Sequence, residues 1–231
     1  LIMITEEKKK PSLDLHNPDL YLNRDLSILE FNWRVLQQAL DPSVPLLERL
    51  NYLCISCTNL DEFFEVRVAG LIQQVEISDP YLEADQVPAS ESLKNLSVRA
   101  HELVEEQYHV LNEVLLPALA EADIKILPRL DWTDQQKGWL YNYFLDEISP
   151  ILSPMGLDSA HPFPRILNKS LNFIISLVGK DSFGRNRSSA IIQAPRSLAR
   201  VIPLPEEVCP SGSYNFVFLS SIIHAFADDL F

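Results

Sequence analysis

The segment Cys54–Arg67, CISCTNLDEFFEVR, holds side chains that could do chemistry. Cys54 and Cys57 form a C-x-x-C pair, a spacing found in metal sites and in disulfide-exchange sites. The remainder places one amide, that of Asn59, among carboxylates and aromatic rings. The two halves of the segment therefore predict different functions and are weighed separately.

The cysteine pair has three interpretations. A structural zinc site needs four ligands, and the third cysteine, Cys209, is distant and has no paired His or Cys nearby. A thioredoxin-like pair begins a helix after a strand, whereas Leu46–Leu53 already has a helical pattern before Cys54. We interpret Cys54 and Cys57 as small buried residues one helical turn apart, with a redox pair of low thiol pKa as the alternative.

The polar half of the segment contains two possible helix caps. Thr58 and Asn59 are each followed three positions later by an acidic residue, the spacing of a capping box. This pattern predicts that the helix breaks between Cys57 and Leu60 and then restarts. A helix start offers free N–H groups that suit an anion or a nucleotide, although an ordinary capped helix would show the same pattern.

Other candidate sites are weaker. Asp61 and Glu65 share a helix face at i, i+4 and could hold Mg²⁺, but carboxylates near a helix start also neutralise its positive end. His161 has Ser159 and Asp158 nearby in sequence, and a catalytic triad and a loop histidine are both compatible with that. The six glycines form neither G-x-x-x-x-G-K nor G-x-G-x-x-G, which excludes a nucleotide site of those two kinds.

Helical patterns dominate the first half of the chain. Residues 1–19 are polar and aperiodic and predict a flexible tail. Apolar residues then recur at steps of three and four in three long patterns, with Pro45 starting the second and Ser90 as the expected N-cap of the third. The apolar stripe of the first pattern is Leu26, Leu29, Trp33, Leu36 and Leu40. Residues 20–124 are therefore predicted to form an all-α bundle.

The second half has a different character. Thr133, with Gln136 three residues later, predicts a capping box and a further helix. Four short segments then read as strands: LNFIISLVGK, SSAIIQAP, ARVIPLP and YNFVFLSS. Residues 125–231 are thus predicted to form a mixed α/β domain, which makes the fold class α+β. The last helical pattern reaches Phe231 without a stop signal, so we expect a C-terminally truncated fragment.

Composition limits the function. The 231 residues are 47% apolar and contain neither a signal-peptide core nor a long enough apolar stretch for a transmembrane segment. Three cysteines fit a reducing compartment, so we expect a cytoplasmic location, with peripheral membrane association left open. A net charge of −13 argues against nucleic-acid binding.

The charge is unevenly distributed. Residues 101–150 carry ten acidic and three basic side chains, a net charge of −7. Residues 161–205 carry one acidic and seven basic side chains, a net charge of +6. The basic stretch Lys180–Arg200 could dock on the acidic segment of a second copy, or it could simply be solvated.

The stretch Tyr21–Leu71 closely resembles the amino-terminal domain of bacterial polyphosphate kinase. The resemblance rests on NRDLSILEFNWRVL, PLLERL and NLDEFFEVR, in order and at family-like spacing. The second half is similar as well, through HPFPRILNKSLNF and YNFVFLSSIIHAFADDLF, which look like the head-domain motifs of the family.

The resemblance implies a four-domain phosphotransferase that moves the terminal phosphoryl group of ATP reversibly onto polyphosphate, through a phosphohistidine and with Mg²⁺. It implies that this fragment holds a nucleotide-capping domain and much of a dimerisation (head) domain, with homodimers or larger oligomers as the assembly. The nucleotide-contacting Asn of the family falls on Asn59. Neither the phosphohistidine position nor the metal site falls within this chain, so we expect no catalytic or metal-binding residue here. By this resemblance, none of the five histidines of the chain is the phosphohistidine: His16, His101, His109, His161 and His224.

Two expectations follow. The fragment alone should have no kinase activity and negligible polyphosphate affinity, since the −7 segment repels a polyanion. The rival interpretation is a free-standing helical protein-interaction module, and an open reading frame that ends at Phe231 would favour it.

Overall fold

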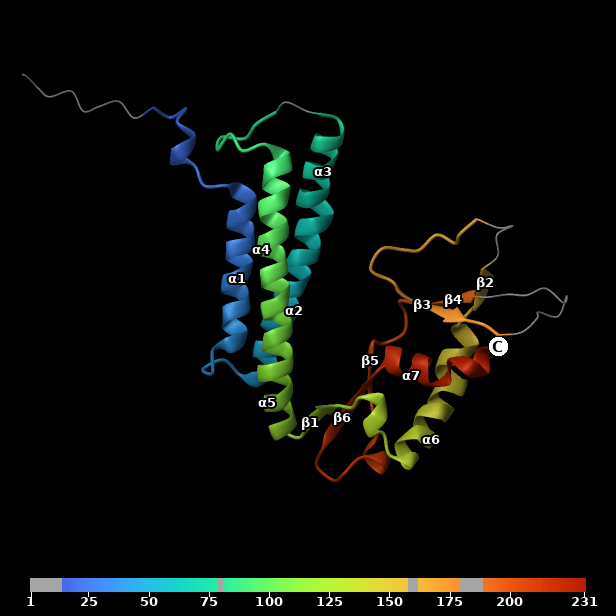
Figure 1. The fold of residues 1–231 in the computed structure, drawn as a ribbon. Helices are drawn as coiled ribbons and strands as arrows, with labels where there is room; N and C mark the ends of the chain where they lie inside the picture. The colour runs from blue at the N-terminus through green and yellow to red at the C-terminus, as the bar shows by residue number, and fades with distance from the viewer. Residues whose placement is uncertain (1–13, 79–80, 158–161, 179–188) are drawn as a thin grey trace, which may run out of the picture. The chain divides into compact units, whose positions relative to one another are not determined.

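The computed structural model describes residues 14–78, 81–157, 162–178 and 189–231, and the chain forms two compact units (Figure 1). The first unit ends at Ala118 and the second begins at Leu119. This division falls a few residues before the expected boundary at 124/125. The segment before strand β1 (Ile124–Ile126) goes with the second unit, since β1 pairs with β6 (Tyr214–Phe218).

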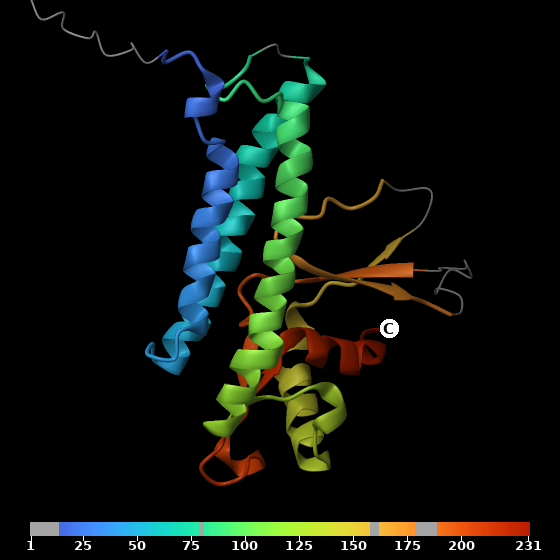
Figure 2. The same cartoon turned by 60° about the vertical axis from the view of Figure 1, so that its left-hand side comes forward.

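The first unit is a bundle of three helical rods, which lie side by side in both views (Figures 1 and 2). The first rod is α1, Arg24–Leu40. The second rod is continuous and consists of α2 (Leu46–Phe63), a π-helical turn (Phe64–Val68) and α3 (Ala69–Glu76). The third rod consists of α4 (Ala89–His109), a π-helical segment (Val110–Leu115) and the start of α5 (Leu116–Glu121), whose last three residues belong to the second unit. The predicted all-α bundle is therefore confirmed.

The interior of the bundle is built from apolar side chains of all three rods. The stripe predicted for α1 is confirmed in part, because Leu29 and Leu36 are fully buried while Trp33 is only partly buried. The buried set is Leu29, Leu36, Ala39, Leu53, Leu60, Phe63, Val68, Leu96, Ala100, Leu103, Val110 and Leu115. Burial of this set from water is the main stabilisation of the bundle.

Two helix starts differ in how they are capped. The Asn23 side chain accepts a hydrogen bond from the backbone N–H of Leu26 (2.9 Å) and caps α1. The prediction that Ser90 caps α4 is wrong, because the helix begins at Ala89. Pro88 precedes the helix with a fixed φ, and its carbonyl accepts the backbone N–H of Ser92 (2.9 Å).

The described residues of the second unit form two three-stranded sheets. In the first, β6 lies between β1, which runs parallel to it, and β5 (Val201–Pro203), which runs antiparallel. In the second, β4 (Ser189–Ala194) lies between β2 (Met155–Leu157) and β3 (Leu171–Ser176), and both pairings are antiparallel. The four predicted strands are confirmed, whereas β1 and β2 were not predicted.

The part of the second unit that the structure describes also contains the helices α6 (Asp134–Tyr143), which continues as a π-helical segment (Phe144–Ile148), and α7 (Leu219–Phe226). The predicted capping box of α6 is confirmed: Thr133 Oγ1 accepts from the Gln136 N–H (3.2 Å), and Gln136 Oε1 accepts from the Thr133 N–H (3.0 Å). The short 3-10 helices of the two units are Pro18–Leu20, Arg129–Asp131, Ser149–Ile151, Glu206–Val208 and Ala227–Leu230. The described part of the chain contains no helix that is long and apolar enough to span a membrane.

Candidate functional site: the Asn59 pocket

Asn59 lies in the middle of an unbroken helix. The predicted break between Cys57 and Leu60 is wrong, since α2 runs continuously from Leu46 to Phe63. The Thr58 hydroxyl donates to the carbonyl of Cys54 one turn earlier (2.9 Å), so it bonds back into its own helix instead of capping a new one. The irregularity of this rod is the π-helical turn that begins at Phe64. A helix N-terminus therefore cannot explain an anion or nucleotide site at Asn59.

The Asn59 side chain belongs to a chain of polar groups that crosses the bundle. Its Nδ2 donates to Asn32 Oδ1 on α1 (3.3 Å), and Asn32 Nδ2 donates to the carbonyl of Ser56 (2.9 Å). The Ser56 hydroxyl in turn accepts from Gln107 Nε2 on α4 (2.9 Å). Asn32 is 2% exposed and Ser56 is 0% exposed, so these groups must find their partners within the protein.

A pocket of about 330 Å³ opens beside this amide, entirely within the first unit. Its walls come from α1, α2 and the π-helical turn, and most of the side chains are apolar. The lining residues are Ile28, Leu29, Phe31, Asn32, Asn59, Glu62, Phe63, Val66 and Arg67. An apolar pocket with a few convergent polar groups is the usual form of a small-molecule site.

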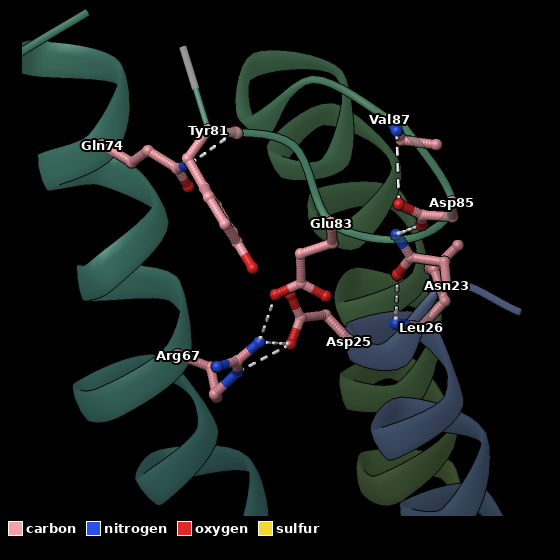
Figure 3. Close-up of polar contacts among 9 residues, drawn as sticks. All are labelled: Asn23, Asp25, Leu26, Arg67, Gln74, Tyr81, Glu83, Asp85 and Val87. Atoms are coloured by element: carbon pink, nitrogen blue, oxygen red, sulfur yellow. Dashed lines mark hydrogen bonds and ion pairs between the residues drawn. The ribbon is translucent and has the colours of Figure 1, made fainter. Parts of the chain in front are cut away.

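Arg67 connects the pocket to the N-terminal end of α1 (Figure 3). Its guanidinium lies 2.7 Å from the buried carboxylate of Asp25 and 3.4 Å from Glu83, a residue of the segment between α3 and α4. The hydrogen bond to Asp25 is the main cause that raises the pKa of Arg67 above its ordinary value. Arg67 therefore stays charged, and these two carboxylates are its ion-pair partners.

A second set of contacts holds the segment 81–88 against the bundle. Asn23 Nδ2 donates to Asp85 Oδ2 (2.8 Å), and Asp85 Oδ1 accepts the backbone N–H of Val87 (3.2 Å). Gln74 of α3 donates to the carbonyl of Tyr81 (2.9 Å). Figure 3 shows these contacts on the same side of the bundle as the Arg67 cluster. Asn23 thus caps α1 and anchors this segment at the same time.

The cysteine pair is not buried, and that prediction is wrong. Cys54 and Cys57 are both exposed on α2, one turn apart, because the core of that helix is made by Leu53, Ser56 and Leu60. Removal of its thiol from water, followed by the proximity of Cys54 and Asp61, raises the pKa of Cys57 above its ordinary value. A redox-active pair needs the opposite shift of the pKa. Within the described ranges, no group of three or more His, Cys, Asp or Glu side chains could hold a metal ion.

None of the other candidate residues that the structure describes lines this pocket. His161, Ser159 and Asp158 are outside the described residues, as are residues 179–188 of the basic stretch. His16, His101, His109 and His224 do not line the pocket. Asp61 and Glu65 are exposed on the second rod, and their magnesium role stays a prediction.

Sequence reasoning missed Asn32, Ser56, Gln107 and Arg67. One signal was present for Asn32: it is polar, yet it stands three residues after Leu29 and four before Leu36, on the buried face of α1. A polar residue in an apolar stripe predicts a buried polar contact. Arg67 offered no such signal, because its partners Asp25 and Glu83 are distant in sequence.

Comparison with known proteins identifies the class. Residues 21–127 match the family model of the polyphosphate kinase N-terminal domain, and residues 135–231 match that of the polyphosphate kinase middle domain. Each unit thus matches a domain of the same family. The chain belongs to the polyphosphate kinase family.

Individual relatives agree with this assignment. The chain is 53% identical over 221 residues to a polyphosphate kinase of Pseudomonas syringae pv. tomato, covering 96% of this chain and 30% of that protein. It is 52% identical to one of Neisseria meningitidis serogroup B, covering 91% of the chain and 30% of the relative. The crystal structure of polyphosphate kinase from Porphyromonas gingivalis matches with a TM-score of 0.70 at 29% identity, over 90% of this chain and 31% of that one. The chain therefore spans about a third of the length of these relatives.

Proposed function

We propose that this chain forms the nucleotide-capping and dimerisation part of a polyphosphate kinase that transfers the terminal phosphoryl group of ATP reversibly to polyphosphate. The family and the names of the relatives support the reaction class. The observation that carries the role of this chain is the position of Asn59, whose amide borders an apolar pocket of about 330 Å³. An amide offers a donor and an acceptor without adding charge, which suits a nucleotide.

The chemical step is assigned to the rest of the longer protein. The relatives are about three times as long as this chain, which leaves room outside it for the proposed phosphohistidine and Mg²⁺ site. By this proposal the 231-residue chain alone transfers no phosphoryl group and does not retain polyphosphate. The net charge of −7 over residues 101–150 supports the second point, since like charges repel.

Dimerisation is proposed for the second unit. Several of its large apolar side chains face solvent, among them Phe163 (63% exposed), Ile174 (69% exposed) and Val178 (104% exposed). Exposed apolar groups of this kind are stabilised when a partner covers them. The proposed location is the cytoplasm, which the free cysteines and the proposed use of ATP both support.

The test of the nucleotide role is Asn59→Ala in the full-length kinase that carries this chain. Loss of one hydrogen bond should weaken ATP binding by about 1 kcal/mol, close to a fivefold rise in KM for ATP. Asn51→Ala is the matched control, because Asn51 is an exposed amide on the same helix, remote from the pocket lining. An unchanged KM for ATP together with a lower melting temperature would mean that Asn59 stabilises the bundle and does not bind the nucleotide.

A further inference from the structure

The polar chain that crosses the bundle has a fixed direction. The Ser56 carbonyl is a backbone oxygen and can only accept, so Asn32 must offer it the NH₂ group (2.9 Å). The other end of the Asn32 amide, Oδ1, then faces Asn59 and requires a donor there. Asn59 satisfies it with Nδ2 (3.3 Å). The order of the groups therefore follows from chemistry alone, starting from a backbone carbonyl.

This direction determines what Asn59 can present to a ligand. With Nδ2 committed to Asn32, the Asn59 amide keeps its Oδ1 and its second N–H for the pocket. If the amide turned by half a rotation, its oxygen would face the Asn32 oxygen, and two acceptors would meet in a buried site. Asn32 is 2% exposed, so water has little access to relieve that contact. Asn32 thus holds the Asn59 amide in one of its two orientations.

The surroundings favour the base of a nucleotide over its phosphates. The two charged residues of the lining are Glu62 and Arg67, and Arg67 is already paired with Asp25 (2.7 Å) and Glu83 (3.4 Å) (Figure 3). The carboxylates around the pocket outnumber this one guanidinium, which disfavours a triphosphate. The apolar walls suit an aromatic base instead.

We propose that Asn32 is a positioning residue that sets the Asn59 amide to read adenine, so that this pocket discriminates adenine from 6-oxopurines. This proposal rests on the proposed nucleotide role of Asn59. Adenine presents an amino donor beside a ring-nitrogen acceptor, which matches an amide oxygen beside an N–H. Hypoxanthine presents a carbonyl acceptor beside a protonated ring nitrogen, which would need the turned amide.

The experiment compares ATP with ITP as phosphoryl donors for the full-length kinase, because the two bases differ at position 6 and at the neighbouring nitrogen. Asn32→Ala removes the constraint on the Asn59 amide. The kcat/KM for ATP divided by that for ITP should then fall about fivefold. The fall should come from a higher KM for ATP, with kcat for ATP unchanged. Asn32→Asp keeps an oxygen that faces Asn59 and should retain the ratio, even though losing the bond to Ser56 lowers the stability.

Ser56→Ala is the matched control. It removes the hydroxyl that accepts from Gln107 (2.9 Å) but keeps the carbonyl that holds Asn32, so the protein should become less stable with an unchanged ATP/ITP ratio. The proposal is overturned if Asn32→Ala keeps the wild-type ratio, or if Ser56→Ala lowers the ratio as much. If Asn32→Ala does not fold, Asn32→Asp decides, and a lowered ratio in that variant overturns the proposal.

The two proposals can fail separately. If Asn59→Ala leaves the KM for ATP unchanged, the nucleotide role of the pocket is wrong, and the role of Asn32 falls with it. If Asn59→Ala raises that KM while Asn32→Ala leaves the ATP/ITP ratio unchanged, the nucleotide role stands and the positioning role of Asn32 is wrong.

Discussion

Arg67 Nη2 lies 2.7 Å from Asp25 Oδ1, and the side chain of Asp25 is only 4% exposed. The pair joins the first turn of α1 to the π-helical turn between α2 and α3. Because Asp25 has little access to water, its negative charge depends on Arg67 for compensation. The ion pair therefore fixes how the first two rods meet beside the Asn59 pocket.

Arg67→Ala should be strongly destabilising, because it leaves the Asp25 carboxylate buried without its charge partner. The expected loss in the free energy of unfolding is about 3 kcal/mol, measured by urea denaturation. Adding Asp25→Asn to this variant should recover part of the loss. Lys137→Ala is the control, since Lys137 and Asp134 form an exposed pair at 3.7 Å and should contribute less than about 0.5 kcal/mol. Equal losses for the two single variants would contradict the importance of burial.

The two roles of Asn23 can be separated by substitution. Asn23→Ser keeps an oxygen that caps α1 but loses the amide that donates to Asp85 (2.8 Å). We expect faster amide hydrogen exchange in residues 81–88 with little change in α1. Asn23→Ala loses both contacts and should cost about 1 kcal/mol of stability in addition. If the two variants exchange alike throughout α1 and residues 81–88, the cap contributes nothing measurable.

The fold could be predicted from the sequence wherever the signal is local and long. The rods α1 and α4 carry apolar stripes over many residues, and the Thr133 capping box lies within one turn, so both were found. The start of α4 was misplaced because a proline carbonyl can begin a helix without a capping side chain. Strands β1 and β2 form by pairing with β6 and β4, which are distant in sequence, so no local pattern predicts them.

The candidate site was predictable for one residue and not for its surroundings. Asn59 was identified through a family motif, but the cap assigned to it does not exist, because α2 runs unbroken from Leu46 to Phe63. The partners of Asn59 and Arg67 come from another rod or from the α3–α4 connection. Such contacts depend on the packing of the rods, which spacing along one helix does not determine.

The ion pair between Glu30 and Arg99 should give the stability a weak dependence on pH. Arg99 Nη2 donates to Glu30 Oε2 (3.0 Å), and this contact lowers the pKa of Glu30. Because the folded-state pKa is the lower one, the contribution is complete above the ordinary glutamate pKa. It disappears as the pH falls through the folded-state value.

Glu30→Gln should therefore lose less than about 1 kcal/mol at neutral pH, since the Glu30 side chain is 49% exposed, and progressively less as the pH falls below the ordinary glutamate pKa. The free energy of unfolding measured across this range, at low and high salt, checks the sign and the screening. Glu113→Gln, on the third rod, controls for the loss of a carboxylate elsewhere on the bundle. A loss that grows toward acidic pH would contradict the lowered pKa.

Cys57 should behave as a slowly reacting thiol, because its residue is exposed while its sulfur is partly withdrawn from water. This partial desolvation raises the pKa of Cys57, so its alkylation by iodoacetamide should be slower at neutral pH than that of free cysteine and still increase beyond about pH 9. Peptide mass spectrometry resolves the two sites, and Cys54→Ser isolates Cys57 from its neighbour. The substitution should change the stability by less than about 0.5 kcal/mol. A Cys57 that already reacts at its maximal rate at pH 7 would instead restore the redox interpretation of the C-x-x-C pair.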